Sequence, residues 1–131
     1  MTSLHQKLFA FWSQFTHDGK PIPAYYAGMV PNNAQFPYIT FSVSRGDAFS
    51  QGINTAFVWF RRENGESPMP KCAAVLGQIA EAIPRSGTLI KTAEGRVALY
   101  RNGSDWQTDM PDAEDSDVLG GRTSYQINYY L

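Results

Sequence analysis

The chain has 131 residues, of which 43% are hydrophobic and 18% charged, and this composition predicts one folded domain over residues 1–131 rather than a disordered chain. The formal net charge of −1 argues against a general attraction to nucleic acid or to an anionic membrane. The single cysteine excludes an internal disulfide, and because the sequence shows neither a signal peptide nor an apolar stretch of the ~20 residues that a membrane span needs, we expect a soluble protein made in the cytoplasm.

An amphipathic helix is predicted at the start of the chain. Apolar residues recur there at helical spacing and share one face: Leu4, Leu8, Phe11, Trp12 and Phe15. Ser3 and Gln6 fit a capping box at its first turn, and Asp18-Gly19 is expected to end it, because glycine accepts the left-handed conformation of a helix C-cap.

Strand patterns follow the first helix. Residues 24–30 form a weak strand candidate, and residues 37–45 and 53–62 alternate as half-buried strands do, with a polar loop at 46–52 between them. Residues 53–60 carry large side chains on both faces. We therefore expect this strand to be central in the sheet, or to have one face covered by a partner.

The second half of the chain predicts a helix and three more strands. Ser67-Pro68 matches a helix start, and one helical face is apolar: Cys72, Val75, Leu76, Ile79 and Ile83. Residues 88–92 and 96–101 read as a hairpin, and residues 122–131 as a closing strand. The element order favours an α+β fold with a mostly antiparallel sheet and two helices packed on one face.

Residues 102–119 show no useful periodicity and are predicted to form a long irregular connection. They hold six of the twelve acidic residues and no lysine or arginine: Asp105, Asp109, Asp112, Glu114, Asp115 and Asp117. Asp115, Asp117 and Gly120 fit part of a calcium loop, but Leu119 and Gln126 occupy ligand positions and fail. A solvated acidic loop and a loop that meets basic groups of a neighbour are the other readings, and we favour the last.

No catalytic constellation is evident. Cys72 lies on an apolar helix stripe, which indicates a buried structural thiol, and His5 and His17 do not share a helix face. Nucleophile elbows, P-loops and dinucleotide fingerprints are missing from the sequence, so we expect neither catalysis nor a cofactor nor a metal.

Three arginines are candidates for an interface. Arg45, Arg61 and Arg62 are predicted to cluster where the two opening strands meet solvent. They either protect a sheet edge from unwanted pairing or form ion pairs with an acidic neighbour, such as the 105–117 region of another copy.

Three segments together resemble a small tail-completion, or tail-terminator, protein of long-tailed bacteriophages and prophages. They are the strand start Phe36-Pro37-Tyr38-Ile39-Thr40-Phe41 after an amphipathic helix, the strand end Val58-Trp59-Phe60-Arg61, and Asp115-Ser116-Asp117 leading to Tyr125-Gln126-Ile127-Asn128-Tyr129. The resemblance covers nearly the whole chain in the order of its elements.

The resemblance implies a non-enzymatic α+β protein that forms a ring, expected to be a hexamer. Such a ring caps the tail tube, stops its growth and presents a surface to the head–tail connector. The implied partners are further copies of the chain, the tail tube protein and the connector, first in the host cytoplasm and then in the virion tail. The alternatives are another neck, minor tail or capsid component, or a small-molecule-binding α+β domain. The candidate interface residues are Arg45, Phe49, Arg61, Arg62, Asp105, Trp106, Asp112, Glu114, Asp115 and Asp117.

Overall fold

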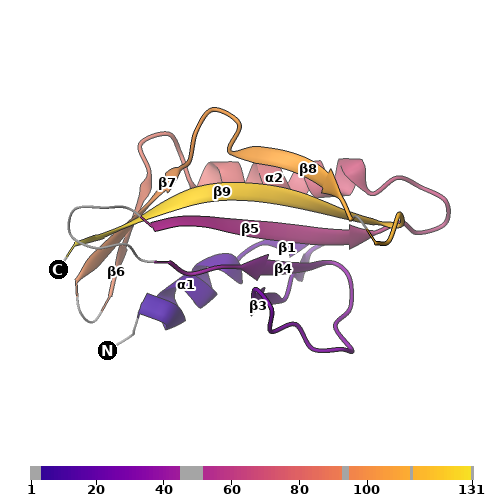
Figure 1. Cartoon of the computed structure of the whole chain (residues 1–131), viewed down its shortest axis with the longest axis horizontal. Helices are drawn as coiled ribbons and strands as arrows, with labels where there is room; N and C mark the ends of the chain where they lie inside the picture. Colours follow the sequence, from indigo (N-terminus) through magenta and orange to yellow (C-terminus); the bar gives the residue numbers. More distant parts are fainter. Residues whose placement is uncertain (1–3, 45–51, 93–94, 113, 131) are drawn as a thin grey trace.

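A computed structural model describes residues 4–44, 52–92, 95–112 and 114–130. It contains two helices and a mostly antiparallel, curled sheet, which confirms the predicted α+β class (Figure 1). The elements in chain order are α1 (Leu4–Trp12), β1 (Thr16–His17), β2 (Lys20–Pro21), β3 (Ala24–Tyr26), β4 (Tyr38–Phe41), β5 (Gly52–Arg61), α2 (Met69–Ala82), β6 (Thr88–Lys91), β7 (Arg96–Arg101), β8 (Gln107–Pro111) and β9 (Val118–Tyr130).

The large sheet is built around the two longest strands, β5 and β9. Its order is β3-β4-β5-β9-β7-β6, with β8 also paired to β9, and every pairing except β3 with β4 is antiparallel. β5 pairs with β9 over its whole length, from Gly52 opposite Ile127 to Arg61 opposite Val118. The predicted central position of this strand is therefore confirmed, since it has a hydrogen-bonded neighbour on each side.

One edge of β9 is shared by two strands that are separated by a bulge. β7 pairs with the C-terminal part of β9 and β8 with its N-terminal part. Between them, residues 102–106 loop out opposite Ser124, whose carbonyl accepts from the Asn102 amide (3.1 Å) and whose amide donates to the Trp106 carbonyl (2.6 Å). The prediction of an irregular connection over residues 102–119 is thus wrong, because β8 lies within it and β9 already begins at Val118.

α1 packs its aromatic face onto the sheet. Trp12 is fully buried between the rings of Phe41 (6.2 Å between centroids) and Tyr125 (5.2 Å). The helix ends at Trp12, so the prediction that Asp18-Gly19 ends it is wrong. Asp18 and Gly19 have φ angles of 51° and 75° and instead form the turn between β1 and β2, a conformation that glycine and aspartate tolerate well.

α2 begins one residue later than the sequence suggests, with Pro68 at its N-cap and Ser67 Oγ accepting the Met69 amide (3.3 Å). The predicted apolar face is confirmed as buried. Cys72 of this face lies directly over Gly121 of β9, where any Cβ atom would collide with the thiol. Helix and strand approach closely at this point because Gly121 has no side chain.

The C-terminal end of α2 is held by a side chain from the sheet. Arg101 of β7 donates from Nε to the Ile83 carbonyl (2.7 Å) and from Nη2 to the Ala80 carbonyl (2.9 Å). Its guanidinium also lies 4.4 Å from the centre of the Trp106 ring. A cation at this end of a helix satisfies free carbonyls and matches the helix dipole.

Candidate functional site

Large aromatic side chains line the half-buried face of β4 and β5. Along β5, Ala56, Val58 and Phe60 are buried, whereas Phe57 and Trp59 remain partly open to solvent. Tyr38 of β4 lies opposite Trp59 and therefore shares its face. The alternation predicted from the sequence is correct, and it places an apolar surface where a solvated sheet usually carries polar residues.

The rings of this face contact one another. Phe57 and Trp59 stack with 5.0 Å between centroids and an angle of 18°, and Phe36 lies 5.1 Å from Tyr38. Trp59 Nε1 donates to Thr40 Oγ1 at 3.0 Å. The Trp59 ring covers Gly120 of β9 so closely that a Cβ atom there would lie 2.7 Å from it. The indole is thus held by a hydrogen bond at its Nε1 edge. It packs directly on the backbone of Gly120, because that residue has no side chain.

These rings form the floor of an open groove of about 520 Å³. We call it the aromatic groove and define it by Phe36, Tyr38, Phe57 and Trp59 as its floor and by Asp112 and Glu114 as its acidic lip. The lip comes from the turn between β8 and β9, which reaches the groove because β9 pairs with β5. The sequence predicted the lip residues Asp112 and Glu114 as interface candidates, but it did not predict the floor. The signal for the floor was the presence of aromatic residues on both faces of residues 53–60.

The acidic turn is ordered by its own side chains. Asp112 Oδ1 accepts the amides of Glu114 (2.8 Å) and Asp115 (3.2 Å), and Asp115 Oδ1 accepts the Asp117 amide (3.0 Å). Aspartate often folds a turn in this way, because its side chain replaces a backbone acceptor.

Arg61 and Arg62 pair with this turn within the same chain. Arg61 Nη1 lies 2.9 Å from Asp115 Oδ2, and Arg62 Nε lies 3.6 Å from Asp117 Oδ1. The Asp117 amide lowers the pKa of Asp115, and Arg61 adds to that effect. These arginines already have carboxylate partners within the chain, and the hypothesis that the two charge sets meet between copies stays a prediction.

Asp112 and Glu114 differ from their neighbours in the turn. In the part of the chain that the structure describes, neither has a basic group within 4.0 Å. Burial raises the pKa of Tyr38, and the negative charge of Asp112 raises it further. The lip therefore presents uncompensated negative charge beside an apolar floor.

The other predicted interface residues lie elsewhere. Trp106 is half-buried against the core and covers Arg101, and Asp105 is exposed in the neighbouring bulge. Arg45 and Phe49, with most of the loop predicted at 46–52, lie outside the described residues. Of the predicted interface residues that the structure describes, those it brings together are Arg61, Arg62 and the carboxylates of the 112–117 turn.

Comparison with known proteins assigns no family. No family model matches the chain, and neither the curated proteins nor the solved structures contain a match. Its function must be argued from the geometry of its surfaces.

The single cysteine and the candidate metal ligands can be placed in the described residues. Burial raises the pKa of the Cys72 thiol to about 12, with Asp109 adding to the shift, so the thiol stays protonated at neutral pH and is a poor nucleophile. Within the described ranges, no three histidine, cysteine or carboxylate side chains gather as metal ligands would. The same part of the chain holds no helix with the length and apolar character that a membrane crossing requires.

Proposed function

We propose that the chain is a non-enzymatic structural protein of the tail-terminator type. Several copies would close the tail tube of a phage or prophage as a ring, expected to be a hexamer, end its growth and offer a joining surface to the head connector. The observation that carries this proposal is the aromatic groove, an open surface on the sheet with an aromatic floor. Protein interfaces are enriched in tyrosine, tryptophan and phenylalanine, and monomeric proteins seldom leave such rings together in solvent.

The arrangement of the helices supports the same function. Trp12 of α1 contacts Tyr125, and Cys72 of α2 lies over Gly121, two residues of β9 that share one side of the strand. We propose that both helices cover this side of the sheet. The opposite side, with Phe57 and Trp59, is then the one left for contacts with other proteins.

Negative-stain imaging of the purified protein, with and without the tail tube of the phage or prophage that encodes it, tests this proposal. We expect a ring at the end of the tube. When the protein is added during assembly, we expect the tubes to be shorter on average, because the ring ends their growth. A protein that stays monomeric at every concentration, by sedimentation, and never binds a tube end would disprove it.

A further inference from the structure

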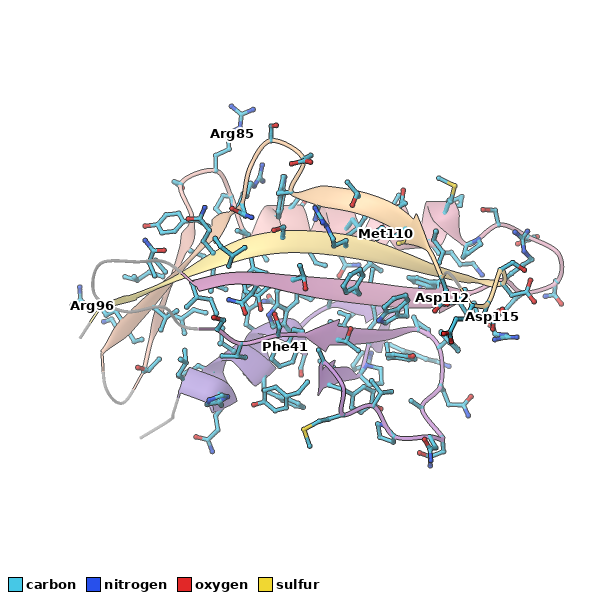
Figure 2. All side chains as sticks on the ribbon, viewed as in Figure 1. Phe41, Arg85, Arg96, Met110, Asp112 and Asp115 are labelled. Atoms are coloured by element: carbon cyan, nitrogen blue, oxygen red, sulfur yellow. The ribbon has the colours of Figure 1, made fainter. Side chains whose placement is uncertain are left out.

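The described residues at the two ends of the sheet differ in charge. At the end where β9 begins, residues 61–66 and 112–117 hold six carboxylates and two guanidinium groups, so the negative charges outnumber the positive ones. At the other end of β9, the β6–β7 hairpin presents Lys91 and Arg96, which are exposed and directly opposite each other in register. Figure 2 shows Arg96 at one extreme of the molecule and Asp112 and Asp115 near the other.

The hairpin end also carries exposed apolar surface. Leu89 lies on β6, which is the last strand of the sheet, and it is 55% exposed. Leu89 and Lys91 are two residues apart on this strand, so they point to the same side. Among the described residues, neither Lys91 nor Arg96 has a carboxylate within 4.0 Å. We call Leu89, Lys91 and Arg96 the basic patch.

The basic patch and the aromatic groove match in chemistry. Leu89 suits the aromatic floor, and Lys91 and Arg96 suit the unpaired Asp112 and Glu114 of the lip. A cation that reaches the lip also passes close to the Tyr38 and Trp59 rings, which attract it. Arg61 is the only cation that lines the groove among the described residues, and it is already paired with Asp115.

The two surfaces cannot meet within one chain. β9 has 13 residues and joins the two ends, which places them roughly 40 Å apart at the usual rise of a strand. Their complementarity is therefore available only between copies. A contact between two different surfaces of identical chains repeats from copy to copy, and it closes a ring when the rotation allows.

We infer that the aromatic groove of one copy receives the basic patch of a second copy. The inference rests on the proposed function, because it names the surfaces through which the copies assemble. Leu89 packs on the aromatic floor, and Lys91 and Arg96 pair with Glu114 and Asp112.

Charge reversal on each surface tests the inference. The patch variant is Lys91→Glu with Arg96→Glu. The groove variant is Glu114→Lys with Asp112→Asn, because asparagine keeps the Oδ1 acceptor that orders the turn. We expect each variant alone to associate about tenfold or more weakly than the wild-type chain in sedimentation experiments, and an equimolar mixture of the two to recover most of the association.

A matched control carries the same change of charge as the patch variant, away from both surfaces. Lys20→Glu with Arg85→Glu alters two exposed residues and should leave association unchanged. If wild-type chains assemble and both test variants assemble equally well, the inference is wrong while the proposed function stands. The same result would show that Lys91 only protects the edge strand, or that another protein occupies the groove. If wild-type chains assemble neither alone nor on the tube, both fail.

Cross-linking provides a second readout that does not depend on charge. A chain with Leu89→Cys mixed with a chain with Glu114→Cys should give a covalent dimer under mild oxidation. Cys72 is fully buried and should not compete. Lys20→Cys in place of Leu89→Cys is the control, and a mixture that cross-links no better than this control overturns the inference.

Discussion

Trp59 has its position on the sheet because of a glycine on the neighbouring strand. Gly120 lies opposite Trp59 in the register of β5 and β9, and the indole lies flat over the space that a side chain would fill. Gly121, the next residue, leaves room for Cys72 on the opposite side of the strand. This pair of glycines is therefore a point of close packing on both faces of the sheet.

Replacing Gly120 by alanine should push the Trp59 ring out of place. The new Cβ atom would lie 2.7–3.1 Å from three ring carbons, and we expect the free energy of unfolding to fall by about 1–3 kcal/mol, as overpacking usually costs. Urea denaturation measures the change. Gly77→Ala in α2 is the control, since nothing lies within 4 Å of its Cβ position and it should gain up to about 1 kcal/mol. Equal stability of Gly120→Ala and the wild-type chain would show that the indole is not held in this way.

Among the helices and strands, the features that could be predicted from the sequence are those that follow from local residue patterns. The apolar stripe of α2, the alternation of β5 and the β6–β7 pairing follow from periodicity, and the structure confirms each of them. β8 was missed because its residues, with Asp109 and Pro111, do not favour a strand on their own. It exists because β9 offers it a partner edge, which only the folded chain shows. The aromatic groove was missed for the same reason, since its floor and its lip come together through the β5–β9 register.

Arg101 links β7 to the C-terminal end of α2 and to the Trp106 ring, and it should therefore matter more than an ordinary surface arginine. Arg101→Met removes two hydrogen bonds to the C-terminal carbonyls of α2 and leaves those carbonyls without the donor. We expect a loss of about 1.5–3 kcal/mol in the free energy of unfolding, measured by urea denaturation. Arg85→Met, at an exposed site in the nearby loop, should stay within about 0.5 kcal/mol of the wild-type chain. If both variants lose the same amount, Arg101 does not cap the helix.

At the scale of the whole molecule, a net charge of −1 conceals an uneven distribution. The acidic turn and the basic patch lie at opposite ends of β9, so charges that nearly cancel in sum are separated in space. Composition alone could not show this separation. Nor could it show that Arg61 and Arg62 meet the acidic turn of their own chain, whereas Lys91 and Arg96 have no carboxylate within 4.0 Å among the described residues.

Association between copies should weaken as salt is added. Raising the ionic strength from about 0.1 M to about 1 M shortens the screening length from ~10 Å to ~3 Å and reduces the attraction between the lip and the basic patch. Sedimentation across this range should show a rising dissociation constant for the wild-type chain and a smaller change for the patch variant. Association that strengthens with salt would indicate that apolar contacts alone hold the copies together.

The length of β9 sets the distance between the acidic turn and the basic patch, and its pleat sets the face on which each side chain lies. The acidic turn precedes its first residue. Beside its last residues lies β7 with Arg96, and β6 on the far side of β7 carries Leu89 and Lys91. Because successive side chains alternate between the two faces, inserting one residue in the middle of β9 would turn half of the strand over, whereas two residues would only lengthen it. The spacing between successive copies would then be set by counting residues in one strand, and the loops around it could vary without changing that spacing.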